Sequence, residues 1–192
     1  SGSVGFMLNA ESPFSILDAA EHSARLDEDL WPQLVSSAGN LDVLTSGPLR
    51  AGASIEPAQV RRLLEFARRQ YQVICADLSG GLSEFELEVL REAKKILLVC
   101  TPEIASLRLA REKLGLLRSQ ELEEKVLLVA SRVAKRTELP AAEIEKLLGR
   151  PVFMEIPNDY AAVCRALKRG IPIPEMAERF AALASKLANP DP

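Results

Sequence analysis

Residues 95–131 read KILLVCTPEIASLRLAREKLGLLRSQELEEKVLLVAS, and this stretch decides the fold class. Its two ends, 95–101 and 125–131, are short runs rich in Val, Ile and Leu that are apolar on both alternating faces, as strands covered on both sides are. Between them, residues 103–118 repeat their apolar side chains at helical spacing. A strand, a helix and a strand in this order predict a crossover between parallel strands.

The same alternation continues on both sides of this unit. Further strands are expected at 72–78 (QVICADL) and 151–157 (PVFMEIP), with a weaker one at 41–47 (LDVLTSG). Helical periodicity covers four more segments, namely 59–69, 140–148, 158–169 and 174–187. The sequence therefore predicts one α/β domain over residues 1–188, with a mostly parallel sheet and helices on both faces. Residues 1–13 are expected to begin in a loop, and 189–192 to form a frayed tail.

Composition excludes several classes of protein. The chain has 192 residues, of which 47% are hydrophobic and 27% charged, as in an ordinary globular protein, and its net charge of -3 gives no signal for nucleic acid. No apolar run approaches the roughly 18 residues that span a bilayer, and no secretory signal is present, so a cytoplasmic location is expected. Cys75, Cys100 and Cys164 are odd in number and lack CxxC spacing, which favours buried reduced thiols over a metal site or disulfides.

Polar residues follow each predicted strand. In an open parallel sheet, ligands gather outside the carboxyl ends of the strands, so these residues are the candidate site. They are Asp77, Ser79, Gly80 and Gly81; Thr101, Pro102 and Glu103; Ser131 and Arg132; and Pro157, Asn158, Asp159 and Tyr160.

Each of these groups also has a purely structural interpretation. Asp77 before two glycines suits a role near Mg²⁺ and phosphate, and equally a tight turn that caps a helix from Leu82. Thr101 reads as the N-cap of the next helix, and Asn158 or Asp159 as the cap of a later one. Arg132 begins a small basic cluster that is either a solvated loop or a phosphate clamp. Neither GxxxxGK[ST] nor GxGxxG occurs in the sequence.

Four stretches, taken in order, resemble the ParA/MinD family of deviant Walker ATPases, and most closely its CpaE-like and TadZ-like pilus-assembly branch. The resemblance runs from about Val4 to Ile173. The stretches are FSILDAAEHSARLDEDLWPQLV (14–35) with LDVLTSG (41–47); YQVICADLSGG (71–81), similar to the Walker B strand; ILLVCTPEIASLRLAREKLGLLR (96–118); and EIEKLLGRPVFMEIPNDYAAVCRALKRGIPI (143–173).

The resemblance implies a P-loop NTPase architecture and a Mg²⁺-dependent ATPase that dimerises around its nucleotide. It also implies protein partners in a pilus, secretion or other polar assembly. By position, Asp77 would take the Walker B role, acting on Mg²⁺ indirectly, and Gly80 would be the switch glycine. The adenine would lie against Pro157, Asn158 and Asp159. Ser131 and Arg132 stand where the family has an Asn-Arg pair, so Ser131 departs from the pattern.

A larger departure is at the start of the chain. The family opens with a strand, the loop KGGxGKT, a helix and a second strand, and this sequence begins after such a unit. We therefore expect a longer natural protein, and no ATP hydrolysis by this chain alone. The alternatives are a ParA-like scaffold without catalysis, acting by dimerisation and partner binding, and a small-molecule module or reductase on a doubly wound sheet. The C-terminal stripe, which includes Met176 and Phe180, is expected to pack on the sheet rather than to bind a membrane.

Overall fold

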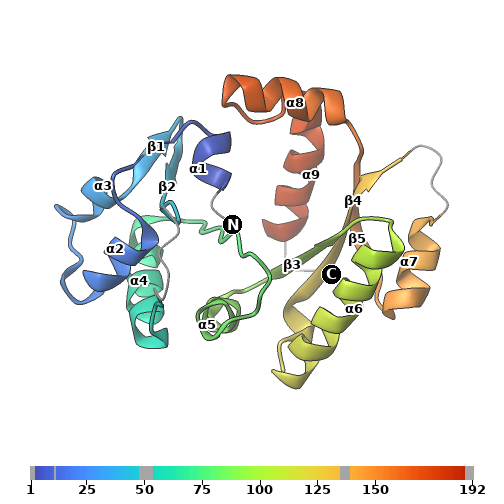
Figure 1. The fold of residues 1–192 in the computed structure, drawn as a ribbon, viewed down its shortest axis with the longest axis horizontal. Helices are drawn as coiled ribbons and strands as arrows, with labels where there is room; N and C mark the ends of the chain where they lie inside the picture. The colour runs from blue at the N-terminus through green and yellow to red at the C-terminus, as the bar shows by residue number, and fades with distance from the viewer. Residues whose placement is uncertain (1–2, 11, 48–53, 135–138, 189–192) are drawn as a thin grey trace. The chain divides into compact units, whose positions relative to one another are not determined.

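The computed structural model describes residues 3–10, 12–47, 54–134 and 139–188 (Figure 1). They form two compact units, which we name by position. The N-terminal unit comprises Ser1–Glu92 with Leu167–Pro172, and the sheet unit comprises Ala93–Ala166 with Ile173–Pro192. Within the described residues, no helix is both long enough and apolar enough to cross a bilayer.

The sheet unit is built on three parallel strands in the order β3-β4-β5. Their bounds are β3 Ile96–Cys100, β4 Val126–Val133 and β5 Val152–Pro157, which confirms the strands predicted at 95–101, 125–131 and 151–157. β4 has a strand on each side, and Leu128 at its centre pairs with Leu98 of β3 and is fully buried. The parallel α/β class predicted from the sequence is therefore confirmed.

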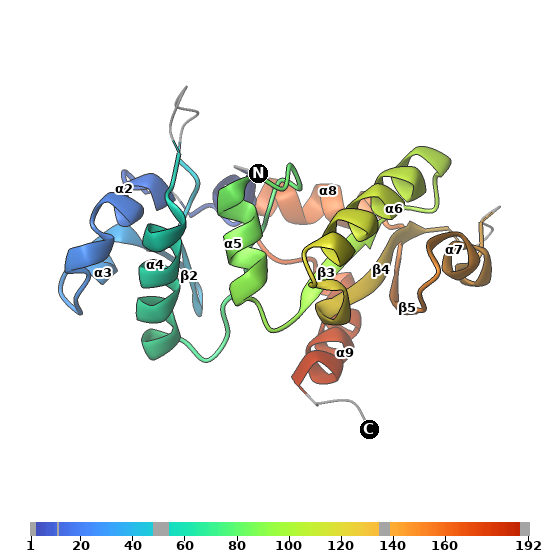
Figure 2. The ribbon, with the colours of Figure 1, turned by 90° about the horizontal axis from the view of Figure 1, so that it is seen from below.

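Helices lie on both faces of this sheet. Figure 2 shows α6 (Ile104–Ser119) on one side of the strands and α9 (Ala177–Ala188) on the other. α6 packs against β3 and against α7 (Ala141–Leu148), and it buries the predicted apolar stripe with Leu107, Leu114 and Leu117. Gly149 ends α7 in the left-handed region at φ 66°, where glycine costs least, and so confirms the predicted C-cap.

The C-terminal helix is less buried than expected. Met176, in the short 3₁₀ turn η3 (Pro174–Met176), is buried, but Phe180 of α9 remains 41% exposed, and α9 buries none of its side chains. Lys186 of α9 holds its ammonium 5.4 Å from the ring centroid of Phe153 on β5. Of the predicted stripe, Met176 is buried, Leu183 and Leu187 are half-buried, and Phe180 is exposed.

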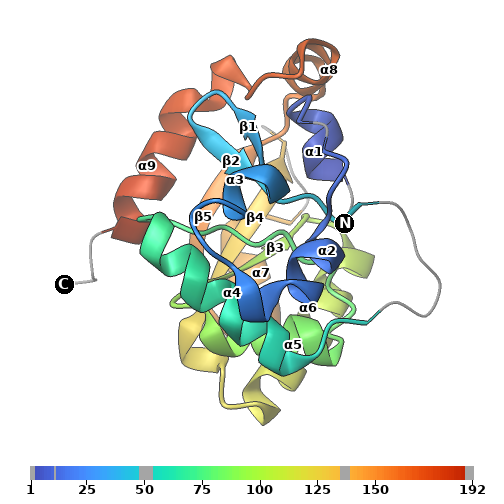
Figure 3. The ribbon, with the colours of Figure 1, turned by 90° about the vertical axis from the view of Figure 1, so that its left-hand side faces the viewer.

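The N-terminal unit is mainly helical (Figure 3). Its core joins Ala19, Trp31, Leu34, Leu63, Phe66 and Ala67. The Trp31 indole N–H donates to the Tyr71 hydroxyl at 2.7 Å, and that hydroxyl donates to the Asp42 carboxylate at 2.7 Å. Its elements are α1 (Ser3–Met7), α2 (Ile16–Glu21), η1 (Ser23–Arg25), α3 (Trp31–Leu34), β1 (Ser36–Ala38), β2 (Leu41–Val43), α4 (Pro57–Gln70) and α5 (Glu84–Glu92).

In this unit the expectations for residues 72–78, Cys75 and the first residues of the chain are wrong, and the weak strand is confirmed in part. Residues 72–78 form no strand, and Val73 is 76% exposed. A β-strand requires backbone hydrogen bonds to a neighbouring strand, and no described strand pairs with residues 72–78. Cys75, which lies in this segment and was expected to be buried, is exposed. Residues 3–7 form a helix rather than a loop. The weak strand predicted at 41–47 is real over Leu41–Val43, but it pairs antiparallel with β1 through a two-residue turn at Gly39.

Candidate functional site

The glycine-rich loop that follows Asp77 is organised by one carboxylate, that of Glu86 on α5. Asp77 itself is exposed, while Gly80 has a left-handed backbone at φ 78°, a conformation that favours glycine. The Glu86 Oε1 atom accepts from the Ser79 hydroxyl at 2.7 Å and from the Gly80 N–H at 3.0 Å. Its Oε2 atom accepts from the Ser83 N–H at 2.9 Å and from the Ser83 hydroxyl at 3.1 Å. One buried side chain thus holds both ends of residues 79–83.

These hydrogen bonds keep the Glu86 carboxyl ionised. Burial alone raises its pKa, because the charged form loses water. The hydrogen bonds from Ser83, Ser79 and Gly80 outweigh burial and lower the pKa to about 2. Since the loop donates to the charged form, the loop conformation and the ionised carboxylate stabilise each other.

Ser83 and Glu86 also form the N-terminal cap of α5. The Glu86 N–H donates back to the Ser83 hydroxyl at 3.4 Å, which completes a capping box at the first turn. The interpretation in which Asp77 caps a helix from Leu82 is therefore wrong, because α5 begins at Glu84 and Ser83 caps it. Glu86 is absent from the site predicted from the sequence, although the pattern Ser-x-x-Glu before the apolar residues of α5 is a known helix-start signal.

The five residues predicted to lie against the adenine or beside it come together at the carboxyl ends of β4 and β5. Ser131 and Arg132 sit where the β4–β5 register shifts, and Arg132 has a left-handed backbone at φ 58°. Pro157 pairs with Val133, and the Asn158 N–H donates to the Val133 carbonyl at 3.0 Å. The irregular ladder therefore turns the ends of both strands into one short polar edge.

The helices that follow the strands have only some of the N-caps predicted from the sequence. Asp159 Oδ1 accepts from the Ala162 N–H at 2.9 Å, so Asp159, one of the two residues named, caps α8 (Tyr160–Arg169). Thr101 does not cap α6, because the chain makes a further turn and the helix begins at Ile104 with Glu103 as its N-cap. The Thr101 N–H donates instead to the Ser106 hydroxyl at 2.9 Å.

Removing the cap of α8 should weaken this edge. We expect D159A to lower the free energy of unfolding by about 1 kcal/mol, because the Ala162 N–H loses its acceptor. Urea unfolding followed by circular dichroism measures the change. N158A is the matched control, since Asn158 bonds through its backbone N–H, and it should stay within about 0.5 kcal/mol of wild type. Equal losses in both variants would contradict the assignment.

The candidate residues are therefore brought together in two groups. Asp77 and Gly80 belong to the N-terminal unit, and the five strand-end residues belong to the sheet unit. Among the described residues, no set of three His, Cys, Asp or Glu side chains is placed to hold a metal ion. Asp77 thus offers a single exposed carboxylate rather than a closed metal site.

Comparison with known proteins gives sequence relatives but no family model that matches. A putative septum site-determining protein MinD from Oltmannsiellopsis viridis is 25% identical over 170 residues, covering 83% of this chain and 51% of the relative. Its counterpart from Mesostigma viride is 27% identical over 139 residues, covering 70% and 48%. The chain thus spans about half the length of the curated relatives it matches.

Solved structures share the fold. A ParA family ATPase from Chlorobium tepidum superimposes with a TM-score of 0.81 at 26% identity, covering 90% of this chain and 73% of that one. MinD in the MinC:MinD complex of Aquifex aeolicus gives a TM-score of 0.71 at 23% identity, covering 93% and 72%. MinD of Pyrococcus horikoshii, complexed with Mg-ADP, gives 0.69 at 16% identity, covering 92% and 72%. At these lower identities the last two establish the fold alone.

Proposed function

Because this chain is a relative of the ParA/MinD ATPases in sequence and fold, we propose that it supplies the greater part of an ATP-binding switch protein. The observation that carries the proposal is the polar edge at the carboxyl ends of β4 and β5, in a fold shared with the Chlorobium tepidum ATPase. Ligands of open parallel sheets bind at such an edge.

The strand-end residues are proposed to hold the adenine side of the nucleotide. The Asn158 side chain offers both a donor and an acceptor to a base, while its backbone N–H is already used by Val133. Pro157 gives a rigid apolar surface beside it. Asp159 fixes the start of α8, so its role is to position the edge. Ser131 and Arg132 close the other side of the base.

Asp77 and Gly80 are proposed to serve the phosphate side. A carboxylate is a hard oxygen ligand suited to Mg²⁺ or its bound water, so Asp77 fits the Walker B role. Mg²⁺ itself would neutralise phosphate charge. The Gly80 N–H is bonded to Glu86 in this structure, so a phosphate contact at Gly80 requires that bond to open. In this proposal, the structure therefore shows residues 79–83 in the conformation that does not contact a phosphate.

Hydrolysis is not proposed for these 192 residues by themselves, since they contain no GxxxxGK[ST] loop. It is proposed for the intact protein, acting in the cytoplasm as a homodimer that positions a pilus, secretion or other polar complex. The resemblance of residues 71–81 and 143–173 to the CpaE-like branch supports this finer role. Among the solved structures that share the fold, MinD of Aquifex aeolicus is in a complex with a protein partner, MinC.

Thermal unfolding of the intact protein tests nucleotide binding. At an Mg-ATP concentration one hundred times its dissociation constant, the native state gains about 2.7 kcal/mol, so the melting temperature should rise by several degrees. The proposal fails if Mg-ATP leaves the melting temperature unchanged.

A further inference from the structure

The two oxygens of the Glu86 carboxylate bind different parts of the chain. Oε2 accepts from the N–H and the hydroxyl of Ser83, so it belongs to the N-terminal cap of α5. Oε1 accepts from the Ser79 hydroxyl and from the Gly80 N–H, which both lie before the helix. We call this second pair of hydrogen bonds the clasp. The cap stabilises the helix start, whereas the clasp fixes only the glycine-rich loop.

The backbone between the clasp and the cap is strained. Leu82 has a left-handed backbone at φ 54°, a conformation that a leucine rarely adopts. Such a residue keeps this conformation only where the surrounding contacts hold it. The clasp holds the chain before Leu82, and the cap holds Ser83 after it. Opening the clasp therefore allows residues 79–82 to relax while Ser83 stays at the start of α5.

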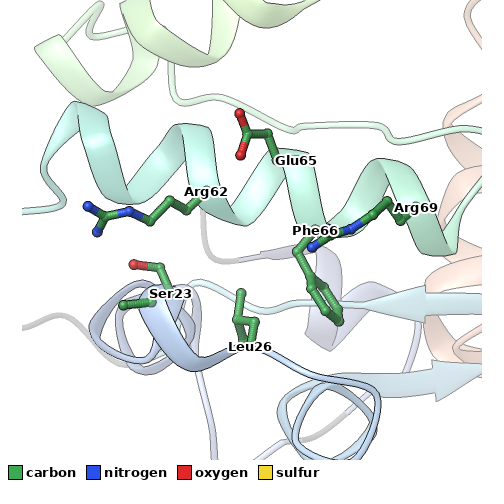
Figure 4. Close-up of a pocket in the computed structure, with 7 residues that line it drawn as sticks. Ser23, Leu26, Arg62, Glu65, Phe66 and Arg69 are labelled. Atoms are coloured by element: carbon green, nitrogen blue, oxygen red, sulfur yellow. The ribbon is translucent and has the colours of Figure 1, made fainter.

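Helix α5 is held in place independently of the clasp. The buried Glu88 pairs with Arg61 of α4, and a second ion pair joins the last turns of the two helices. α4 is itself packed into the core of the unit, where its Phe66 points toward Leu26 beside the pocket shown in Figure 4. Opening the clasp therefore changes the loop and leaves α5 where it is.

We propose that Glu86 regulates the phosphate side of the nucleotide site by competing with a phosphate for the Gly80 N–H. A carboxylate and a phosphate are both anionic oxygen acceptors, so the same N–H suits either of them. Because the clasp must open before the phosphate can bind there, wild type binds Mg-ATP more weakly than a protein with an open loop would. This inference rests on the proposed function and adds to it the residue that regulates the site.

The E86Q variant tests the clasp and keeps the helix cap. Glutamine also serves at this position of a capping box, so its oxygen can stay with Ser83 while its amide donor faces the Gly80 N–H. In the intact protein, amide hydrogen exchange at Gly80 should be about tenfold faster in E86Q than in wild type, because this N–H loses a charged acceptor. Exchange at Ser83 should stay at the wild-type rate.

Calorimetric titration of the same proteins tests the competition. E86Q should bind Mg-ATP about tenfold more tightly than wild type, because a larger fraction of the protein has the open loop. It should bind adenosine, which carries no phosphate, as wild type does. E84Q is the matched control, since Glu84 is exposed in the same helical turn and the substitution removes the same charge. E84Q should bind Mg-ATP with the wild-type affinity.

The outcomes separate a failure of the clasp from a failure of the nucleotide site. Unchanged exchange at Gly80 in E86Q overturns the clasp whether or not a nucleotide binds. Faster exchange with an unchanged affinity for Mg-ATP, or an equal gain of affinity in E84Q, overturns the competition and leaves the nucleotide site in place. If neither wild type nor E86Q binds Mg-ATP, the proposed function and the competition are overturned together, and faster exchange in E86Q then supports the clasp alone.

Discussion

The E86A variant should lose about 3 kcal/mol of its free energy of unfolding, because one truncation leaves four hydrogen-bond donors of the loop without their acceptor. Glu86 is only 5% exposed, so water replaces the carboxylate poorly. The loss exceeds that of an ordinary helix cap because residues 79–83 lose their fixed conformation together with the first turn of α5.

Urea unfolding followed by Trp31 fluorescence measures this loss within the N-terminal unit. E86Q should fall between wild type and E86A, since glutamine keeps one acceptor oxygen but turns an amide donor toward the loop. E84A is the matched control, because Glu84 lies in the same first turn and is exposed, and we expect it to cost less than about 1 kcal/mol. An E86A variant as stable as E84A would show that the carboxylate does not hold the loop.

The difference in the free energy of unfolding between wild type and E86A should depend on pH. The pKa of Glu86 is lowered from 4.5 to about 2 by the loop, so the folded state favours the ionised form. Its contribution to stability is therefore fully present above about pH 4.5 and is lost as the pH falls toward 2. The difference in stability between wild type and E86A should shrink over that range, and a difference that instead grows below pH 4.5 would contradict the lowered pKa.

The sequence predicted the strands of the sheet unit well, although only β4 buries apolar residues on both faces, and Leu97 and Val99 of β3 are exposed. Residues 95–131 could be interpreted without their surroundings, since a short run that is apolar on both faces suits a strand in the middle of a sheet. The segment 72–78 has a similar apolar pattern, yet the pattern does not record whether a neighbouring strand is present. Its apolar character therefore predicted a strand where the structure has an exposed segment without a ladder.

The candidate site could also be predicted only in part. The rule that parallel strands end at one edge was sufficient to bring Ser131, Arg132 and residues 157–159 together. The rule gives no information on hydrogen bonds within a loop, and the control of Gly80 by Glu86 depends on the path of residues 79–83. Thr101 was misplaced for a related reason, because Ser-, Thr- and Pro-rich turns allow several helix starts one to three residues apart.

A second large effect is expected at Asp77. In the intact protein, D77N should reduce ATP hydrolysis at least about a hundredfold, because the amide cannot supply the negative charge that we propose orients Mg²⁺ or its bound water. A steady-state phosphate-release assay measures the rate. D29N removes a similarly exposed carboxylate elsewhere in the N-terminal unit and should hydrolyse ATP at the wild-type rate. Equal rates for D77N and wild type would remove Asp77 from the proposed site.

Calorimetric titration of the intact protein with ATP, with and without Mg²⁺, tests the nucleotide site itself. We predict one ATP bound per chain, an affinity that rises with Mg²⁺ in wild type, and a loss of most of that rise in D77N. N158A should weaken binding about equally with and without Mg²⁺, since Asn158 is proposed to contact the base rather than the phosphates. Wild-type protein that shows no saturable binding of Mg-ATP would contradict the account.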